Sequence, residues 1–133
     1  MDARHATPAD AAAVTAIGGG VFASSDFLAR PRTRLLVWAE PGRTPVGFAA
    51  FTWAPDGGPM VLNGLGPAPL GEKMVRHLLA LSARHGNGEL VAAAPESDFA
   101  SRSLFTRFRC RTALRRNPAG GEDDIAFTIV GAK

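Results

Sequence analysis

Three apolar runs follow one another closely in the first half of the chain, at residues 35–40, 46–53 and 60–65. Two turn segments separate them, Pro41-Gly42-Arg43-Thr44 and Pro55-Asp56-Gly57-Gly58. Proline and glycine in such segments are typical of the short connections between antiparallel strands. The pattern therefore predicts an antiparallel meander of three strands.

A helix is predicted after the meander, because the apolar residues take up a helical spacing from Leu70 onward. Residues 70–84 have one apolar and one polar face, and Gly86 and Gly88 end the helix. The apolar face consists of Leu70, Met74, Val75, Leu78, Leu79 and Leu81, and the polar face of Glu72, Lys73, Arg76, His77 and Arg84. The short apolar run 90–94 then predicts a buried strand.

Another helix and two strands are predicted for the C-terminal part of the chain. Asp98 can cap the helix, because its carboxylate can accept hydrogen bonds from free backbone N–H groups. The expected apolar face consists of Ala100, Leu104, Phe105 and Phe108. Strands are expected near residues 110–114 and 125–130, with the polar loop 117–124 between them.

The N-terminal segment carries the signals of a helix start. Thr7 can cap the helix, Pro8 suits its first position, and Asp10 lies three residues after the cap. Residues 11–17 continue the helix, and three glycines at 18–20 end it, because glycine loses much backbone entropy in a helix.

We expect one domain over residues 1–133, of the mixed α/β (α+β) class. Its twisted, mostly antiparallel sheet should have six to seven strands, flanked by about four helices. Residues 21–33 should add a short helix and a loop. A chain of 133 residues can bury one sizeable core without disulfides or metal. The single Cys110 agrees, because it excludes a disulfide framework and a cysteine zinc cluster.

Membrane insertion and secretion are not indicated by the sequence. The apolar runs are too short for a membrane span, and the N-terminus lacks a basic region followed by an apolar run. We therefore expect a cytoplasmic protein that neither spans nor binds a membrane.

Arginine supplies 13 of the 15 basic residues, and the formal net charge is +3. Arginine favours planar, bidentate contacts with phosphate or carboxylate. Six arginines lie close together: Arg102, Arg107, Arg109, Arg111, Arg115 and Arg116. Phe105 and Phe108 fit core positions at helical spacing, so the cluster lacks the stacking platform of a single-strand nucleic-acid binder. A solvated face is the first interpretation, and a phosphate-bearing small ligand remains open.

The order of these elements resembles the GNAT superfamily of acyl-coenzyme A dependent N-acetyltransferases over nearly the full chain. The opening Arg4-His5-Ala6-Thr7-Pro8-Ala9-Asp10 is common in that family. More specific is the segment Val61-Leu62-Asn63-Gly64-Leu65-Gly66-Pro67, followed by the helix, strand and helix predicted over 70–108. The resemblance implies transfer of an acetyl or acyl group from acyl-CoA to an amine of a small molecule or peptide. It also implies a homodimer through residues 110–130.

The resemblance implies a pyrophosphate-binding loop at the start of the central helix, with the pattern Arg/Gln-x-x-Gly-x-Gly/Ala. Backbone N–H groups at the helix N-terminus bind the phosphates there. This chain keeps Gly71, but Leu70, Lys73 and Val75 differ from the pattern, and Glu72 adds a negative charge. The coenzyme-binding residues implied in this way are Leu65, Gly66, Leu70, Gly71, Glu72, Lys73, Met74, Val75, Arg76 and Phe105.

A slot for the pantetheine arm of the coenzyme is implied between the third strand of the meander and the next parallel strand. The interior Gly64 supports an irregularity there, because such a glycine often marks a bulge or a close approach. The residues expected to line the slot are Val61, Asn63, Leu65 and Ala93.

The catalytic residues implied by the resemblance are changed in this chain. Phe105 occupies the position of the family's proton-donating Tyr, and the chain contains no Tyr. The third strand carries Asn63 and no carboxylate, so Asn63 and Asp98 are the catalytic candidates, with a helix cap as the alternative for Asp98. The other candidate bases are His77, His85, Asp26 and Glu40.

Several interpretations of the sequence remain open. The two histidines of the helix, His77 and His85, are expected to be solvated. Trp38 and Trp53 are expected to be core residues, with one wall of a cleft as the alternative. The chain is expected to be an acyltransferase. The alternatives are a catalytically degenerate GNAT-like protein that binds a partner or serves another reaction, and a nucleic-acid binder that uses the arginine cluster.

Overall fold

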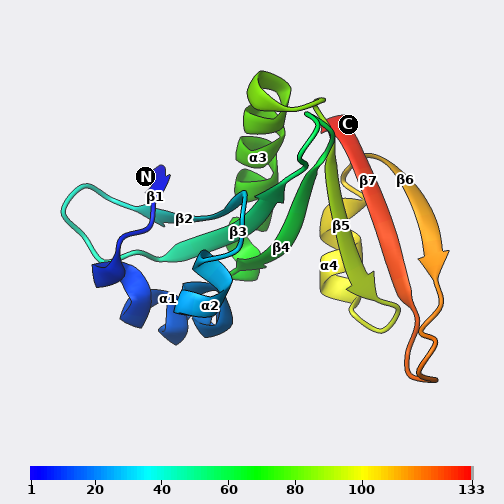
Figure 1. The fold of residues 1–133 in the computed structure, drawn as a ribbon, viewed down its shortest axis with the longest axis horizontal. Coiled ribbons are helices and arrows are strands. Elements are labelled where there is room, and N and C mark those ends of the chain that lie inside the picture. The colour runs from blue at the N-terminus through cyan, green and yellow to red at the C-terminus, as the bar shows by residue number, and fades with distance from the viewer. Residues whose placement is uncertain (133) are drawn as a thin grey trace.

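The computed structural model describes residues 1–132, which form a seven-stranded sheet in the order β1-β2-β3-β4-β5-β7-β6 (Figure 1). The strands are β1 (Asp2–His5), β2 (Thr33–Ala39), β3 (Gly47–Trp53), β4 (Met60–Gly66), β5 (Leu90–Pro95), β6 (Phe108–Arg115) and β7 (Asp124–Ala132). The pair β4–β5 is parallel, and the other neighbouring pairs are antiparallel. The predicted meander is confirmed as β2, β3 and β4.

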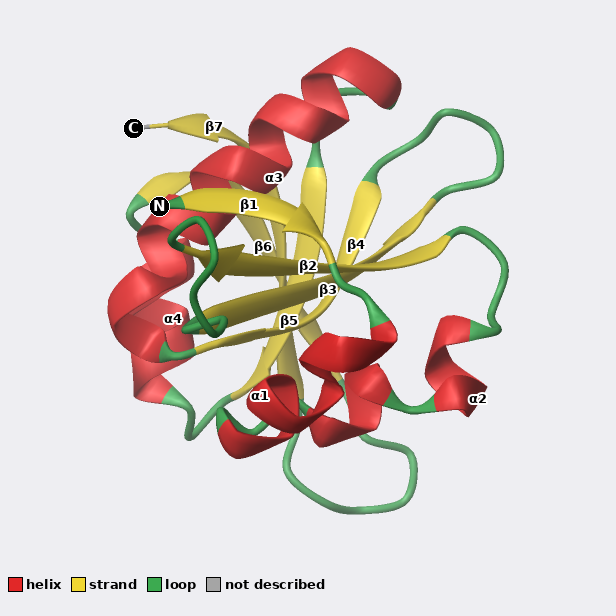
Figure 2. Ribbon diagram, turned by 90° about the vertical axis from the view of Figure 1, so that its left-hand side faces the viewer, coloured by secondary structure: helices red, strands yellow, loops and turns green. Residues whose placement is uncertain are grey.

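Helices cover the sheet from two sides, as Figure 2 shows. The α-helices are α1 (Ala11–Ala16), α2 (Ser25–Leu28), α3 (Gly71–His85) and α4 (Phe99–Phe105), and the 3-10 helices are η1 (Pro8–Asp10), η2 (Gly20–Ala23) and η3 (Ala68–Leu70). The predicted fold class, a mostly antiparallel mixed sheet with about four helices, is confirmed. No helix within residues 1–132 has the length and apolar character that crossing a membrane requires.

Two apolar clusters lie on opposite faces of the sheet, because the side chains of a strand alternate between faces. On β2, Leu36 and Trp38 belong to the larger cluster, which α3 and α4 cover. Leu35 and Val37 belong to the smaller cluster, to which α1 and α2 contribute Val14 and Phe27. The centre of the sheet is therefore buried on both faces.

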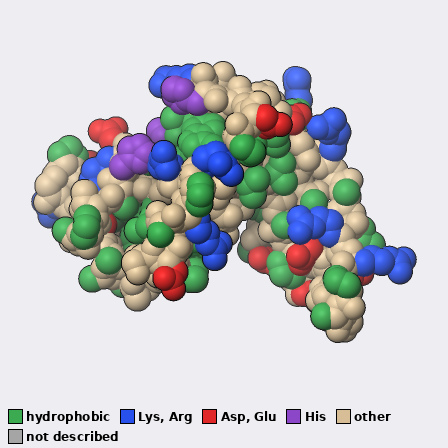
Figure 3. Space-filling model, viewed as in Figure 1, with side chains coloured by type: hydrophobic (Ala, Val, Ile, Leu, Met, Phe, Trp, Pro, Cys, Tyr) green, Lys and Arg blue, Asp and Glu red, His purple; other side chains and the backbone are tan. Residues whose placement is uncertain are grey.

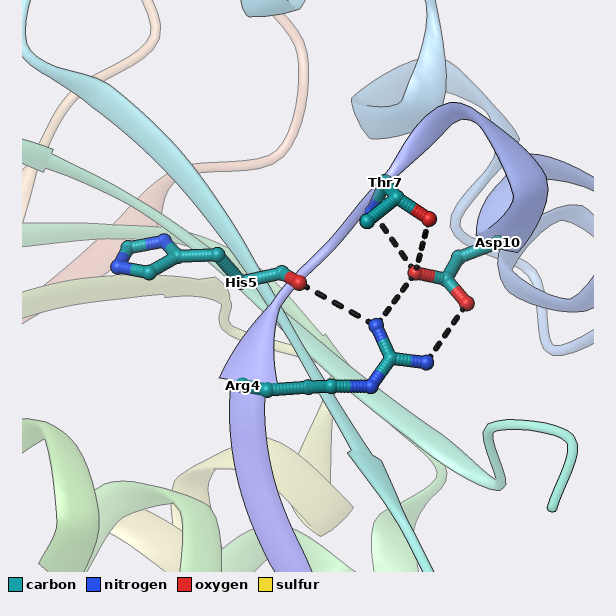
Figure 4. A network of polar contacts seen from close by, with 4 residues as sticks. All are labelled: Arg4, His5, Thr7 and Asp10. Carbon is teal, nitrogen blue, oxygen red and sulfur yellow. Dashed lines mark hydrogen bonds and ion pairs between the residues drawn. The ribbon is translucent and has the colours of Figure 1, made fainter. Parts of the chain in front are cut away.

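The N-terminal strand is tied to η1 by a polar network around Asp10 (Figure 4). The Asp10 carboxylate accepts two hydrogen bonds from Arg4, from Nη1 at 2.7 Å and Nη2 at 2.9 Å. It also accepts bonds from the Thr7 backbone N–H at 2.8 Å and the Thr7 hydroxyl at 3.2 Å. The hydrogen bonds from Arg4 are the main reason that the pKa of Asp10 falls to about 2. The predicted start at Thr7 and Pro8 is confirmed, with Thr7 as the N-cap of η1.

Three predicted details differ from the structure. The last helix ends at Phe105, and Phe108 belongs to β6, because its backbone pairs with β7. Ala100 is exposed and therefore adds nothing to the core. His77 is half-buried instead of solvated, because its ring packs edge-on against Trp38 at a centroid distance of 5.5 Å. Burial is the main cause that lowers the pKa of His77.

Candidate functional site

The parallel strands β4 and β5 pair at their first residues and then diverge. Their register contains two pairs, Met60 with Leu90 and Val61 with Val91. A slot of about 180 Å³ opens beyond these pairs. It is lined by Leu62, Asn63, Gly64, Leu65, Ala92, Ala93, Ser101, Leu104 and Phe105. Figure 3 shows a hollow between the surface of β1–β4 with α1 and α2 and the surface of β5–β7.

Asn63 is the extra residue of a bulge in β4. The register of β3 with β4 shifts there, so that Ala50 pairs with Gly64 while Phe51 pairs with Leu62. A bulge bends its strand and changes the local twist. The bend therefore contributes to the divergence of β4 from β5, as the interior glycine had predicted.

Gly64 is required by the ring of Phe22, which η2 places over β4. A Cβ atom at position 64 would lie 2.4 Å from that ring. Phe22 itself packs against Phe27 and Phe48, at centroid distances of 5.1 and 5.9 Å. An aromatic cluster thus covers Gly64, and any side chain at position 64 would displace it.

The Asn63 amide is oriented by a row of polar side chains across three strands. Its Nδ2 donates to the Thr52 hydroxyl at 2.8 Å, and the hydroxyls of Thr52 and Thr33 are 3.3 Å apart. In residues 1–132, no donor reaches the Asn63 Oδ1 atom. This oxygen can therefore accept a hydrogen bond from a ligand at the slot.

The start of α3 lies beside a second hollow, which we call the phosphate cleft. Its volume is about 410 Å³. It is lined by Ala68, Pro69, Glu72, Ala100, Ser103, Leu104 and Arg107. No side chain within residues 1–132 caps the N-terminus of α3. η3 runs directly into α3, so the Leu70 N–H donates to the Pro67 carbonyl and the Gly71 N–H donates to the Ala68 carbonyl. The positive end of the helix dipole favours an anion beside this turn.

Leu104 lines both the slot and the phosphate cleft. Its Cδ2 atom would be 2.7 Å from a Cβ at Gly71, so glycine is required for this close packing of α4 against α3. The Leu104 side chain therefore stands between the two hollows. A ligand that occupies both hollows requires this side chain to move.

The other residues expected to bind the coenzyme take different positions. Leu65 and Phe105 line the slot, and Glu72 lines the phosphate cleft. The side chains of Met74 and Val75 are fully buried in the core and face neither hollow. Gly66 is buried under the Phe48 ring, Leu70 is half-buried, and Lys73 is exposed. Arg76 pairs with Glu72 at 3.7 Å.

The slot residues predicted from sequence were correct with one exception. Asn63, Leu65 and Ala93 line the slot. Val61 does not line it, because Val61 lies in the paired part of β4. Trp53 is half-buried against the larger core and lines a separate cleft near the end of α3, which is the alternative given for it.

Asp98 serves as the N-cap of α4. Its carboxylate accepts hydrogen bonds from the Ser101 N–H at 3.1 Å and the Ser101 hydroxyl at 2.7 Å. These bonds lower the pKa of Asp98, the hydroxyl contributing most. The structural alternative for Asp98 is therefore confirmed.

The remaining candidate bases do not line the slot. His77 and His85 contact Trp38 and Trp53. Asp26 is exposed on α2, and Glu40 lies 3.6 Å from the N-terminal amine. No group of three or more His, Cys, Asp or Glu side chains within residues 1–132 is placed to hold a metal ion.

Three residues in or beside the slot were not predicted from the sequence: Phe22, Thr52 and Ser101. Thr52 and Phe22 carry no recognisable signal, because their roles depend on strand register and on the path of η2. Leu104 was predicted to be a core residue, and it is in contact with the core, but its position between two hollows follows from the packing of α4.

Half of the arginine cluster lies on the outer strand β6, where Arg109, Arg111 and Arg115 are exposed. Arg111 pairs with Glu89 at 3.1 Å. On α4, Arg102 donates to the Glu96 carbonyl at 2.7 Å and lies over the Phe99 ring. The prediction of a solvated face therefore holds for the arginines of β6, whereas Arg102 contacts the backbone and a ring.

Solved N-acetyltransferases share this architecture over nearly the whole chain. The ribosomal-protein-S18-alanine N-acetyltransferase from Escherichia coli superposes with a TM-score of 0.74 at 18% identity, covering 99% of this chain and 94% of that one. The fold is that of the GNAT N-acetyltransferases. The aminoglycoside 6'-N-acetyltransferase from Enterococcus faecium gives a TM-score of 0.72 at 11% identity, covering 96% of each chain.

A third structure contains the coenzyme. It is a protein from Salmonella typhimurium, assigned as an acetyltransferase and solved with its cofactor acetyl-CoA, with a TM-score of 0.68 at 24% identity and coverage of 100% of this chain and 94% of that one. No protein-family model and no curated protein sequence matches this chain. The similarity between this chain and these acetyltransferases is therefore a similarity of fold.

Proposed function

We propose that this protein is an N-acyltransferase that transfers an acetyl or other acyl group from acyl-CoA to an amine. The observation that carries the proposal is the slot between β4 and β5, which shares the wall residue Leu104 with the phosphate cleft at the start of α3. A solved structure with the same fold was determined with acetyl-CoA. The acceptor class is an amine, because solved relatives of this fold include enzymes named for protein, polyamine and aminoglycoside acetylation.

The two hollows fit the two ends of an acyl-CoA molecule. The narrow slot is apolar on most sides and suits the pantetheine arm, with Leu65, Ala93 and Phe105 along its walls. The phosphate cleft borders the first turn of α3, where the positive end of the helix dipole favours the pyrophosphate. Arg107 lines the same cleft and offers a positive charge to the phosphates. The negative charge of Glu72 opposes phosphate binding, and the ion pair with Arg76 partly offsets this charge.

Bound acyl-CoA supplies an activated thioester carbonyl. The backbone of β4 beyond Val61 is not paired with β5, so its polar groups can hold the acyl arm and the carbonyl oxygen. The Asn63 Oδ1 atom, fixed through Thr52, can accept a hydrogen bond from the incoming amine and orient its lone pair. The amine nitrogen forms the amide bond to the acyl carbon while the carbon–sulfur bond of the thioester breaks, and coenzyme A leaves as the thiolate. The amine's proton passes to water, since none of the described side chains around the slot is a carboxylate or imidazole. Orientation thus supplies most of the rate enhancement.

The experiment that tests the proposal is isothermal titration of the protein with acetyl-CoA, using a variant that fills the slot. Ala93→Phe places a ring in the slot, and Ala113→Phe adds the same ring to an exposed site on β6. We expect saturable binding by the unchanged protein and by Ala113→Phe. Binding by Ala93→Phe should be weaker by at least about tenfold, or about 1.4 kcal/mol, because the ring occupies the space that the pantetheine arm needs. Equal affinities for the two variants, or no binding at all, would contradict the proposal.

A second candidate function is binding without acyl transfer, in a GNAT-fold protein that contacts a partner or serves another reaction. Phe105 favours it, because Phe105 is 4% exposed at the slot and has no proton to donate. Release of free thiol from acetyl-CoA in the presence of a panel of amines distinguishes the two functions. Binding with thiol release supports transfer, and binding without it for every amine supports the second function.

We also propose that the protein forms a homodimer through β6 and β7. The outer strand β6 has an exposed edge, which is a surface for pairing with a second chain. Sedimentation equilibrium at micromolar protein decides the matter, and a monomer would contradict the dimer.

A further inference from the structure

A further cleft, separate from the slot and the phosphate cleft, lies on the α3 face of the sheet, near the C-terminal end of α3. Its volume is about 530 Å³. It shares no lining residue with the slot or with the phosphate cleft. Its walls come from β1, β2, β3, α3 and the turn that follows β3, and the residues used below are His5, Arg34, Phe51, Trp53, Leu81 and His85. We call it the Trp53 cleft.

Basic side chains from three separate elements meet in the Trp53 cleft. His5 ends β1, Arg34 lies on β2, and His85 is the last residue of α3. None of the described residues that line the cleft is an aspartate or a glutamate. The carboxylate nearest in sequence, Asp56, is engaged with the Gly58 N–H at 3.2 Å. The cleft therefore favours an anion.

The Arg34 guanidinium keeps most of its donors for a ligand. Its Nη1 donates to the Thr33 carbonyl at 2.9 Å, which holds the group in place. The guanidinium has five N–H donors in a planar fork that matches a carboxylate. Arg34 makes no ion pair with any of the described residues, so no protein carboxylate competes for it.

The floor of the cleft is a fixed aromatic group. The Trp53 ring lies edge-on to Phe51 at 5.5 Å and to His85 at 6.0 Å between ring centroids. The backbone of Trp53 is held from both sides, because its N–H donates to the Arg32 carbonyl and its carbonyl accepts from Arg32 Nε at 3.2 Å. Trp53 is half-buried, so part of the indole faces the cleft together with Leu81. This surface suits a flat apolar body.

We propose that the Trp53 cleft binds a small aromatic carboxylate, with the ring against Trp53 and the carboxylate on Arg34. The volume of the cleft lies within the usual range for small-molecule sites, about 300–1,000 Å³. The combination of an apolar floor with a few convergent polar groups is also usual for such sites. The site is independent of acyl transfer, because it lies outside the slot and the phosphate cleft.

The test is a titration with 1-naphthoate, followed by the two indole N–H signals in a nitrogen-15 NMR spectrum. The chain contains two tryptophans, and Trp38 is 1% exposed in the core, so it serves as the internal control. We expect a saturable shift of the Trp53 signal and little change for Trp38. The neutral analogue 1-naphthylmethanol and inorganic phosphate should each bind at least about tenfold more weakly, since each lacks one of the two recognised features.

Two matched variants locate the carboxylate. Arg34→Gln should weaken 1-naphthoate binding by about tenfold or more, and Arg115→Gln, the same change at an exposed site on β6, should change it by less than about twofold. Saturating acetyl-CoA should not displace 1-naphthoate, which separates this result from the proposed acyltransferase activity. The proposal is overturned if the neutral alcohol or phosphate binds as tightly as the acid. It is equally overturned if the Trp53 signal does not saturate, or if the two variants behave alike.

Discussion

The two halves of the sheet are built differently. Strands β2 and β3 are buried on both faces, by α1 and α2 on one side and by α3 on the other. Strands β5, β7 and β6 are covered on one face, where Ala92 and Ala94 are buried, while Ala93 on the opposite face is exposed. Two residue pairs between β4 and β5 join the halves within the sheet.

This difference shows how the fold can keep an open slot in its centre. Each half has its own ladder of antiparallel pairs, so neither depends on continuous pairing between β4 and β5. The packing of α3 and α4 in the larger core holds the halves together. Ligand binding can therefore use the backbone of β4 without breaking a ladder.

The largest effect should come from the doubly covered half. Phe48→Ala removes a ring that is 3% exposed between β3 and the α1/α2 side, and Phe to Ala changes in cores cost about 3–5 kcal/mol. The control is Val130→Ala on β7, where the side chain is 45% exposed and the expected cost is within about 0.5 kcal/mol. Urea unfolding measures both variants. Similar losses of stability would show that the two halves do not differ in the way described.

The next effect concerns the charge network that anchors β1 to the doubly covered half. The folded pKa of Asp10 is about 2, below the value of 3.8 in an unfolded chain. Its contribution to stability is therefore fully present above the unfolded pKa and is lost as pH falls through 4 toward 2. Arg4 is partly exposed, so we expect a cost of about 1–2 kcal/mol for Asp10→Asn at neutral pH.

Unfolding free energies measured from pH 7 to pH 2 check this expectation. The unchanged protein should lose stability as the solution becomes more acidic, and Asp10→Asn should lose less over the same range. Asp2→Asn, an equal change of charge at an exposed site on β1, should follow the unchanged protein. A curve for Asp10→Asn that parallels the unchanged protein would contradict the role given to this carboxylate.

The sequence predicted the elements of the fold because their signals are local. The turns around β3, the helical spacing after Leu70 and the cap at Asp98 each follow from residues close in the chain. Gly64 also predicted an irregularity in β4, which the bulge at Asn63 confirms. The boundary between α4 and β6 was placed too late, because Phe108 is apolar in either element and its assignment depends on pairing with β7.

The candidate site was less predictable because it depends on contacts between distant segments. The orientation of the Asn63 amide requires the register that brings Thr52 beside it. The place of Leu104 requires the packing of α4 against Gly71. Alignment to a glycine-rich loop predicted that Met74, Val75 and Glu72 all bind the coenzyme. The helix, however, directs Met74 and Val75 into the core, and only Glu72 lines the phosphate cleft.

A smaller effect is expected where the two halves meet at Leu104. If acyl-CoA fills both hollows, the Leu104 side chain has to leave its preferred conformation, at a cost of about 1 kcal/mol. Leu104→Ala removes this cost and should tighten acetyl-CoA binding by about fivefold. The control Leu114→Ala changes an exposed leucine of β6 and should leave the affinity unchanged. Isothermal titration measures both, and weaker binding by Leu104→Ala would show that Leu104 contacts the coenzyme instead of obstructing it.

The smallest effect should come from the ion pair of the singly covered half, although its length resembles that of the Asp10 network. Arg111 Nη2 lies 3.1 Å from Glu89 Oε2, and the Arg111 side chain is 73% exposed. Such pairs contribute about 0–1 kcal/mol, because water screens the charges and both side chains lose conformational freedom. Arg4, by contrast, donates to a buried carboxylate with two nitrogens. Arg111→Gln should therefore cost less than about 0.5 kcal/mol in urea unfolding, and this cost should shrink as the salt concentration rises. A loss as large as that of Asp10→Asn would mean that the edge of the sheet is held by charge more than by the core beneath it.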